Sequence, residues 1–505
     1  MSIARVTTVQ PQVLTGTIVT IEADISRGLH AFSIVGLAGK AIDESKDRVS
    51  SAIKHSGFDS PKTKNHKIVI SLSPADLKKE GPLFDLPIAI AYLLATEEIT
   101  SDNKERILVG ELGLDGSVRK VRGVLNCVLA AKKAGYQEVV VPTENAAEAA
   151  LVDNIIIYPA ATLRDVIEHI SPIVEATKLI AQPPTHIPET WYESAVTLED
   201  IKGQEAAKRG LVIAAAGRHN VMFVGPPGTG KTMLARALRG LLPPLTREEA
   251  LAVTAIHSLA GNEIEISARP PFRSPHHTAS HTALVGGGSN PKPGEVTLAH
   301  HGVLFMDEFP EFERRSIDAL RQPLEDRVVT ISRVQGTAEF PADFVLVAAL
   351  NPYRGSFDGT TDLARAMNET YKNKVSGPIL DRIDLWLEVP HVDYDTLTSL
   401  KKEPGETEQA REQVKQARER MLARHVGRAA TTNSNLSARD LEELIYLNDE
   451  VKDLLKLSSV KLNLSPRGYH RLIKVARTIA DLDDQEHIEV PHILEALQYR
   501  VPLNT

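Results

Sequence analysis

The sequence predicts a multidomain α/β protein with a helical carboxyl-terminal part, and three observations predict it. Segments rich in β-branched residues alternate with segments of helical apolar spacing until about residue 390. The stretch AQPPTHIPETWYE at 181–193 interrupts this alternation, because its prolines remove backbone donors and disfavour helix. Strand-like segments then stop, and helix-like segments follow at 406–426, 437–457, 465–482 and 490–499. A chain of 505 residues is long enough for about three domains.

We expect the first α/β domain to cover residues 1–175, with a linker over residues 176–196. Within the domain, β-branched segments of strand length are separated by segments whose apolar residues recur at helical spacing. The predicted strands are 15–23, 67–72, 107–112, 138–141 and 154–158, and the predicted helices are 40–55, 84–95 and 123–134.

Composition and charge exclude several classes of protein. The chain has 58 Lys and Arg against 66 Asp and Glu, and its net charge of -8 excludes a globally basic protein that coats nucleic acid. Hydrophobic residues at 42% argue against wholesale disorder. A single cysteine, Cys127, excludes disulfide scaffolds, thiolate zinc fingers and iron–sulfur clusters. MSIARVTTVQ has no apolar signal core, and the longest apolar stretch, 86–95, is about half a membrane span. We therefore expect a soluble, cytoplasmic protein without a membrane partner.

The second domain, expected over residues 197–390, contains a phosphate-binding loop. A helix-like stretch at 204–216 and a short strand at 220–224 lead directly into GPPGTGKT, which fits the P-loop pattern. Its glycines let backbone N–H groups wrap phosphates at the positive end of the next helix. Lys231 would reach the β- and γ-phosphates of ATP, and Thr232 would ligate Mg²⁺. The predicted nucleotide-binding residues are Gly225, Pro226, Pro227, Gly228, Thr229, Gly230, Lys231 and Thr232.

A second motif supplies two carboxylates. In GVLFMDE, at 302–308, four apolar residues describe a buried strand that ends in Asp307 and Glu308. Such a strand delivers its acids to the carboxyl edge of the sheet, where the phosphates lie. Asp307 would hold Mg²⁺ through water, and Glu308 would polarise the attacking water. The predicted base favours hydrolysis of the nucleotide over simple kinase chemistry.

Three further polar residues are candidates for the same site. Asn351 ends a buried strand at 344–350, where it would hydrogen-bond the γ-phosphate and the attacking water; the alternative is an Asn-Pro turn. Arg382 lies between two acids in LDRID, and the alternative is a surface ion pair of little energetic value. Arg467 begins a predicted helix, where it would otherwise only decorate the surface with charge.

Five features of AAA+ ATPases resemble these motifs: Walker A resembles GPPGTGKT, Walker B resembles GVLFMDE, and sensor 1, the arginine finger and sensor 2 resemble Asn351, Arg382 and Arg467. Longer stretches resemble the magnesium-chelatase-like ATPases of the ComM/YifB family: RPPFRSPHHTASHTALVGGGSNPKPGEVTLAHHGVLFMDEFPEF, KVSGPILDRIDL, SPRGYHRLIKVARTIADL and KEGPLFDLPIA. The resemblance implies a homo-hexameric ring with ATP and Mg²⁺ at the subunit interfaces. It also implies that Arg382 is the finger offered to a neighbouring subunit. Arg467 would be the sensor 2 residue of a helical lid over residues 391–505.

A predicted hairpin and a group of histidines bear on the substrate. The stretch 327–340 describes two short strands around a Gln-Gly turn. The resemblance points this hairpin toward a central pore, where Arg333 would contact the substrate; the alternative is a hairpin that only packs. The histidine-rich stretches lack the HExxH glutamate and any thiol, so we expect loop or pore-rim residues and no zinc. These histidines are His276, His277, His281, His300 and His301.

The sequence departs from related families at two places. Many ComM/YifB members carry a four-cysteine segment where this chain has YRGSFDGTTDLARAMNETYKNK at 353–374, without cysteine. The amino-terminal domain resembles the proteolytic domain of the Lon family. Leu83 and Asn126 occupy the positions of its serine nucleophile and lysine base, so we expect a catalytically silent domain and no protease activity.

The leading functional hypothesis is a ring ATPase that moves single-stranded or branched DNA. ComM-like members are understood as helicases that promote branch migration in recombination and natural transformation. Basic residues at 410–428, with Arg269, Arg273 and Arg327 near the predicted pore loops, favour DNA, although basic helices are usually only solvated faces. The alternatives are a protein-remodelling ATPase, a chelatase-type motor and a nucleotide-gated scaffold. The chelatase alternative is weak because the chain lacks a DxSxS motif.

Overall fold

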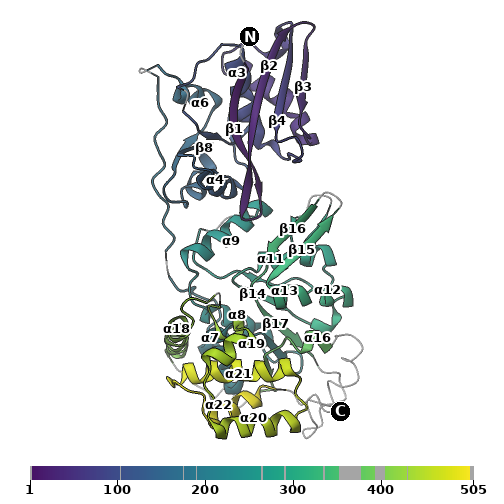
Figure 1. The fold of residues 1–505 in the computed structure, drawn as a ribbon, viewed down its shortest axis with the longest axis vertical. Coiled ribbons are helices and arrows are strands. Elements are labelled where there is room, and N and C mark those ends of the chain that lie inside the picture. The colour runs from purple at the N-terminus through teal and green to yellow at the C-terminus, as the bar shows by residue number, and fades with distance from the viewer. Residues whose placement is uncertain are drawn as a thin grey trace. The chain divides into compact units, whose positions relative to one another are not determined.

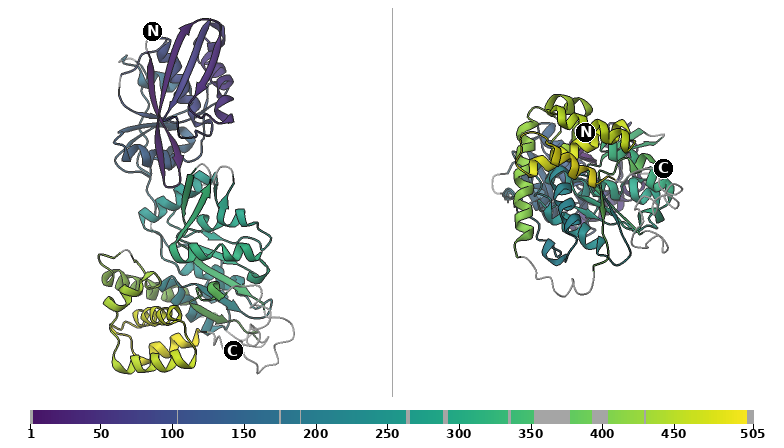
Figure 2. Two further views of the ribbon diagram at one scale, coloured as in Figure 1. Left: turned by 45° about the vertical axis from the view of Figure 1, so that its right-hand side comes forward. Right: turned by 90° about the horizontal axis from the view of Figure 1, so that it is seen from below.

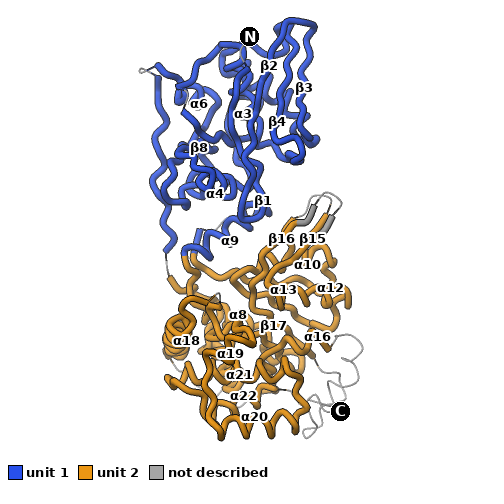
Figure 3. The backbone as a smooth tube through the Cα atoms, in the orientation of Figure 1, with its two compact units in different colours: residues 1–188, 247–267 blue, residues 189–246, 268–505 orange. Residues whose placement is uncertain are grey.

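The chain forms two compact units, distinguished by colour in Figure 3. Unit 1 comprises Met1–Pro188 and Arg247–Ser267, and unit 2 comprises Glu189–Thr246 and Ala268–Thr505. In the described part of the chain, no helix is both long and apolar enough to cross a membrane. The computed structural model describes residues 3–102, 104–173, 176–188, 190–262, 266–288, 292–333, 336–351, 377–392, 404–428 and 430–500.

Unit 1 contains a mixed seven-stranded sheet with the order β3-β4-β2-β1-β5-β8-β9 (Figure 1). The long hairpin β1–β2 is antiparallel, as is the β2–β4 pair, and the remaining pairs are parallel. Alternating buried residues along β2 and β4 place one face of the sheet against the core. The strands are β1 (Ala4–Gln12), β2 (Thr15–Arg27), β3 (Ala31–Val35), β4 (His66–Ser73), β5 (Ile107–Leu108), β8 (Glu138–Pro142) and β9 (Ile156–Ala160), and a separate pair is β6 (Glu111–Leu112) with β7 (Val118–Arg119).

Helix α3 (Asp85–Ala95) is the central helix of unit 1, and every residue from Asp85 to Leu93 is buried. This explains its continuous apolar sequence, because a helix that is apolar all round must be covered on all sides. Helix α9 (Arg247–Ala260) packs against α4 (Val124–Lys133), and the Ser258 hydroxyl accepts a hydrogen bond of 3.0 Å from the N–H of Gly123. The other helices of unit 1 are α1 (Lys40–Asp43), α2 (Ser45–His55), α5 (Ala146–Ala149) and α6 (Leu163–Ile170), with the 3-10 turns η1 (Pro61–Thr63), η2 (Pro82–Phe84) and η3 (Thr143–Asn145).

The predicted strands and helices of this region are confirmed with several differences, and the helix predicted at 40–55 is divided at Glu44 into α1 and α2. The single strand predicted at 107–112 is wrong: β5 and β6 belong to different sheets and are separated by Gly110. A Cβ at Gly110 would lie 2.8 Å from Val118, so the close packing of β7 requires glycine there. Strands β1 and β3 were not predicted.

Unit 2 is built on a five-stranded parallel sheet with the order β11-β14-β17-β10-β18. Every residue of the three central strands is buried, as expected for a sheet covered on both faces. The strands are β10 (Val221–Val224), β11 (Phe272–Arg273), β14 (Val303–Met306), β17 (Val345–Leu350) and β18 (Leu385–Glu388). The helices around the sheet are α7 (Glu205–Gly217), α8 (Lys231–Leu241), α10 (His281–Val285), α11 (Glu295–Leu298), α12 (Arg314–Asp318), α13 (Arg321–Asp326) and α16 (Gly377–Leu380), with η4 (Leu198–Asp200) and η5 (Phe309–Glu311).

The predicted hairpin is present in unit 2. Strands β15 (Val328–Arg333) and β16 (Gly336–Pro341) pair antiparallel and separately from the main sheet, and they extend out from its helices (Figure 2). The hairpin immediately precedes β17, as the sequence predicted. A smaller pair joins β12 (Gly286–Gly287) and β13 (Lys292–Pro293).

The carboxyl-terminal part of unit 2 is helical, as predicted. Helix α18 (Glu406–Arg424) packs on α7 and on α21 (Pro466–Leu482), which in turn packs on α22 (Val490–Gln498). The single helix predicted at 437–457 is wrong, because α19 (Ala438–Leu444) ends at Ile445, whose backbone is extended. Helix α20 (Asp449–Lys461) then starts at Asn448, whose side chain accepts a 2.8 Å hydrogen bond from the N–H of Val451.

Candidate nucleotide-binding site

The P-loop joins β10 to α8 and has the backbone shape that phosphate binding needs. Gly228 and Gly230 adopt φ values of 81° and 91°, in the left-handed region that glycine tolerates best. At Gly225, a Cβ would lie 2.1 Å from the carbonyl oxygen of Val389, so only glycine fits beside β18. The first N–H groups of a helix have no partner within that helix, so the start of α8 suits the binding of an anion.

Lys231, the first residue of α8, is nearly buried beneath this loop. Its ammonium group donates to the carbonyl oxygens of Gly225 at 2.8 Å and Pro226 at 2.7 Å. Burial lowers the pKa of Lys231 below its ordinary value. A desolvated cation held by neutral oxygens gains more by facing anionic phosphates, so the position fits the predicted role.

The two predicted Mg²⁺ residues meet across the sheet edge. The Thr232 hydroxyl donates to the Asp307 carboxylate at 3.3 Å, although the two residues belong to different βα connections. A hydroxyl and a carboxylate oxygen beside a phosphate loop form the donor set that Mg²⁺ prefers. The residues present therefore fit Mg²⁺, and Thr232 and Asp307 would hold it.

Glu308 has a constrained backbone and an unforeseen neighbour. Its φ of 49° and ψ of 44° are left-handed, which turns the chain sharply after β14, and its N–H donates to Asp307 at 2.9 Å. His277 Nδ1 lies 3.2 Å from the Glu308 carboxylate, and its ring also packs edge-on against Phe312. The sequence predicts His277 only as a loop or pore-rim residue. No motif in the surrounding HHTASH sequence predicts that His277 contacts Glu308.

Asn351 lies at the same edge of the sheet. It directly follows β17, which lies between the Asp307 strand β14 and the P-loop strand β10. The N–H of Gly225 donates to the carbonyl oxygen of Leu350 at 3.2 Å, which ties the start of the P-loop to the residue before Asn351. The structure thus brings five predicted residues together at the carboxyl edge of the sheet, where the strands end: Lys231, Thr232, Asp307, Glu308 and Asn351.

Arg382 lies at the amino edge of the sheet, where the strands begin, opposite to the carboxyl edge where the P-loop lies. It precedes β18, and its carbonyl oxygen accepts a 3.0 Å hydrogen bond from the Asn220 side chain, just before β10. Since β10 and β18 are parallel, their amino ends share this edge, while the P-loop starts at the carboxyl end of β10. Four residues of strand separate Asn220 from Val224, or about 13 Å. Arg382 therefore lies at the end of the sheet opposite to the P-loop of its own chain.

Arg467 joins Arg382 at this second edge. Both guanidinium groups form ion pairs with the carboxylate of Glu325, on α13. Arg382 is 5% exposed and also donates to the carbonyl oxygen of Pro378 at 2.6 Å. These two arginines are 85 positions apart in the numbering, and no sequence pattern predicts that they share one carboxylate.

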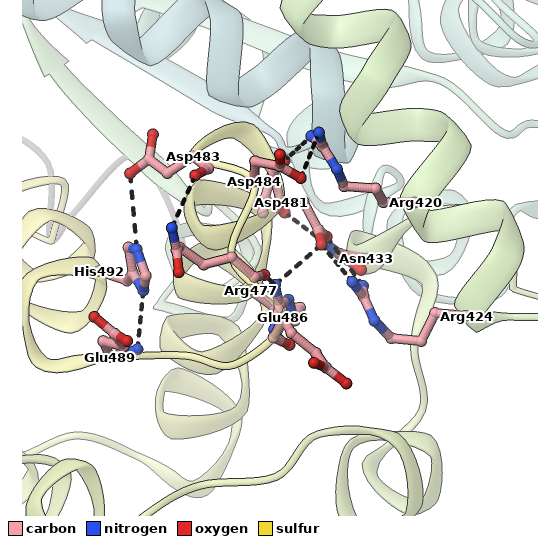
Figure 4. Close-up of polar contacts among 12 residues, drawn as sticks. Arg420, Arg424, Asn433, Arg477, Asp481, Asp483, Asp484, Glu486, Glu489 and His492 are labelled. Atoms are coloured by element: carbon pink, nitrogen blue, oxygen red, sulfur yellow. Dashed lines mark hydrogen bonds and ion pairs between the residues drawn. The ribbon is translucent and has the colours of Figure 1, made fainter.

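The basic residues that favoured DNA on charge alone are engaged within unit 2. In Figure 4, Arg424 reaches Asp481 on α21, and Arg420 pairs with Asp484 at 2.6 Å. Three more arginines of the same stretch, Arg411, Arg418 and Arg428, donate hydrogen bonds to oxygen atoms of the protein. The arginines near the predicted pore loops are also engaged. Arg273 forms a two-bond ion pair with Glu295, Arg269 lies over the ring of Tyr192, and Arg327 pairs with Asp343. Stretch 410–428 is therefore a packing helix rather than a free basic surface.

The remaining predicted residues have separate surroundings. His300 is buried, and burial together with His301 lowers its pKa to about 3. Throughout the described ranges, no three His, Cys, Asp or Glu side chains gather as a metal site. Arg333 ends β15, and its side chain is outside the described part of the structure, as is the segment 353–374.

The Lon-like positions of unit 1 lie in the core. Leu83 is in η2 and Asn126 in α4, and both are buried. Asn126 donates from its side chain to the carbonyl oxygen of Gln12 at 2.8 Å. Neither side chain offers a nucleophile or a base.

Family profiles match three consecutive parts of the chain. The family described as magnesium chelatase, subunit ChlI, matches residues 197–397. Subunit ChlI of Mg-chelatase matches residues 21–145, and the ChlI C-terminal family matches residues 405–500.

Full-length relatives decide the family. Competence protein ComM of Haemophilus influenzae is 44% identical over 491 residues, covering 96% of this chain and 94% of the relative. Protein YifB of Escherichia coli is 42% identical over 95% of this chain and 94% of its own length. The chain belongs to the ComM/YifB family of magnesium-chelatase-like AAA+ proteins. AAA+ members of the magnesium-chelatase family use ATP and Mg²⁺ in general and typically form oligomers. Lon protease 2 of Bacillus subtilis is also similar, at 32% identity over 30% of this chain and 32% of the relative.

Proposed function

We propose that this protein is a Mg²⁺-dependent ATP hydrolase in which each active site is completed by two subunits. The observation that carries the proposal is the split of the candidate residues between two edges of one sheet. Lys231, Glu308 and Asn351 lie at the carboxyl edge, and Arg382 and Arg467 lie at the amino edge. An arginine at the amino edge serves a nucleotide only when a second subunit presents its P-loop there. A closed ring, which we propose to be a homo-hexamer, satisfies every site in this way.

Each residue has a task in this mechanism. Mg²⁺ supplies charge neutralisation for the phosphates when held by Thr232 and Asp307. Lys231 replaces its two carbonyl partners with phosphate oxygens. Glu308 accepts a hydrogen bond from the attacking water, and Asn351 fixes that water toward the γ-phosphate. Arg382 and Arg467 of a neighbour stabilise charge that develops on the transferred phosphoryl group.

We propose DNA, single-stranded or branched, as the substrate of the ring. Two points support this: the resemblance to ComM-like helicases of branch migration, and the name of the Haemophilus relative as a competence protein. The hairpin β15–β16 precedes β17, where the family resemblance predicts a pore hairpin that carries Arg333. The basic helix α18 no longer supports the proposal, because its arginines are engaged internally.

We propose the domain boundaries 1–175, 176–196, 197–390 and 391–505, with a catalytically silent first domain. Leu83 and Asn126 carry this part of the proposal, since they have no peptidase chemistry. Incubation of the protein with casein, ATP and Mg²⁺ should leave the casein intact. ATP-dependent cleavage by the purified chain would overturn the assignment.

Protein remodelling is the second candidate function. The observation that favours it is the similarity to Lon protease 2, which is named for an activity on proteins rather than on DNA. One experiment separates the two. ATPase rate is measured alone, with forked DNA, and with an unfolded protein at equal mass concentration. Stimulation by DNA, with strand movement on a labelled four-way junction, supports the DNA motor. Stimulation by unfolded protein alone supports remodelling.

A further inference from the structure

A small polar cavity lies at the amino edge of the unit 2 sheet, remote from the P-loop. Its floor consists of residues that precede β10, β17 and β18, and its other walls come from the end of α13, from η6 (Asn433–Asn435) and from α21. It therefore lies where the sheet meets the helical lid within one unit. The residues that carry its charge are Arg218, Arg327, Arg471, Lys474, Asp343 and Asp384.

Positive charge exceeds negative charge in this cavity. Four basic side chains share two carboxylates: Arg218 at 3.3 Å and Arg327 at 3.4 Å both pair with Asp343, and Arg471 pairs with Asp384 at 3.0 Å. Lys474 donates at 3.0 Å to the neutral carbonyl oxygen of Ser434. The lining thus carries two more positive than negative charges.

The pKa shifts of two lining residues, Lys474 and Asp343, agree with this excess of positive charge. Burial, the neighbouring Arg471 and the neighbouring Arg327 lower the pKa of Lys474 to about 8. The pKa of Asp343 lies below its ordinary value despite burial, because Arg218 and Arg327 face it. Asp440, another carboxylate near Lys474, already pairs with Arg428 at 3.1 Å. Bringing an excess of charge into a poorly solvated space is costly unless an opposite charge joins it.

The size of the cavity limits what could join it. It holds about 60 Å³ of water-accessible volume. A cavity of this size has room for a small group of several atoms. That size and the planar guanidinium forks around the cavity match a small tetrahedral oxyanion.

We propose that this cavity is a binding site for a tetrahedral oxyanion of the phosphate class, separate from the P-loop of its own chain. The anion supplies the negative charge that the four basic residues lack. It bridges strand-end residues of the core to Lys474 and Arg471 of α21, so its binding fixes the lid against the sheet. The chemistry fits both free phosphate and the terminal phosphate of a nucleic acid.

The test uses the full chain and inorganic phosphate, with excess Mg·ADP to fill the P-loop. Phosphate binding is measured by equilibrium dialysis with ³²P-labelled orthophosphate at constant ionic strength. Lys474→Met removes one charge from the cavity, and Lys456→Met, on the exposed face of α20, is the matched control. Asn435→Asp adds a carboxylate to the lining while it retains the oxygen that accepts from Arg327. A parallel arm replaces orthophosphate with a 5′-phosphorylated dT10.

We expect millimolar or tighter phosphate binding by the parent chain and by Lys456→Met. Binding should weaken at least tenfold in Lys474→Met and in Asn435→Asp, and the latter should melt no lower than the parent. Lys474-dependent binding of the oligonucleotide alone would identify a nucleic-acid terminus as the source of the anion. No binding of either ligand, or equal phosphate binding by Asn435→Asp and the parent, would overturn the proposal. These outcomes do not depend on ATP hydrolysis, because the assay contains no ATP.

Discussion

Arg382 and Glu325 form an ion pair at the amino edge of the sheet, across the full length of β10 from the P-loop. Arg467 pairs with the same carboxylate. One acid thus holds together the two arginines that the sequence assigned to ATP hydrolysis, on a surface remote from the subunit's own Lys231. From this separation we propose that neither arginine serves the P-loop of its own chain.

The base assignment predicts a specific kinetic defect. Glu308→Gln should bind ATP with the parent affinity and lose roughly 10²–10⁴-fold in hydrolysis rate, because the amide cannot take a proton from water. Nucleotide binding and single-turnover hydrolysis are the measurements. Glu313→Gln, which changes an exposed acid nearby, should retain the parent rate. Parental turnover by Glu308→Gln would show that another group is the base.

His277 is predicted to position Glu308. His277→Ala removes the 3.2 Å contact to the carboxylate and should lower kcat by about tenfold. The KM for ATP should change less than twofold, because the ring does not belong to the P-loop. The control is His281→Ala, at the start of α10. A rise in KM with unchanged kcat would mean that His277 acts in nucleotide binding instead.

The stability of unit 1 should depend on pH through Asp85. Burial raises the pKa of Asp85 to about 6, although Arg48 binds it with contacts of 2.7 and 3.0 Å. The folded chain then holds a proton more tightly than the unfolded chain, so this contribution is complete below about pH 4 and is lost as pH rises through 6. Its size is on the order of 3 kcal/mol.

Asp85→Asn tests that dependence because asparagine has the same shape and does not titrate. Urea unfolding of unit 1, followed at pH 4.5 and 7, should show a smaller pH effect in Asp85→Asn than in the parent. An identical pH effect in both proteins would assign it to other groups.

Arg333 is predicted to act on the substrate rather than on ATP. Arg333→Ala should reduce DNA-stimulated hydrolysis several-fold while basal hydrolysis stays within twofold of the parent. DNA affinity should also fall steeply with salt, because contacts to phosphate release counterions. ATPase assays with and without forked DNA at 50 and 200 mM salt are the measurement. Equal loss of basal and stimulated rates would place Arg333 outside the DNA path.

The local sequence was sufficient to predict those features whose backbone shape is determined within a single segment. The P-loop glycines, the buried strand before Asp307 and the hairpin at 327–340 were predicted because their backbone requirements are local. Strand order was not readable in this way. The opposite placement of Arg382 and Lys231 depends on β18 adding beside β10, which no local pattern specifies.

Long-range polar contacts were the other limit. Stretch 410–428 has an ordinary basic helix pattern, but Asp481, about 60 positions later, binds Arg424. Helix α9 lies between two segments of unit 2 in sequence and yet packs with unit 1, through contacts such as Arg247 with Asp153 at 2.6 Å. Such pairings are set by tertiary packing and leave no periodic signal.

The most direct test of the shared active site is a subunit-mixing experiment. Lys231→Ala removes the P-loop cation and retains the arginines, whereas Arg382→Ala retains the P-loop and should lose roughly 10³–10⁵-fold in rate. Each variant alone should therefore be inactive. A mixture of the two should recover hydrolysis, with a maximum near equal amounts, because a Lys231→Ala subunit can offer Arg382 to its neighbour's intact P-loop. Mixtures that stay as inactive as the separate variants, although mixed oligomers form, would contradict the account.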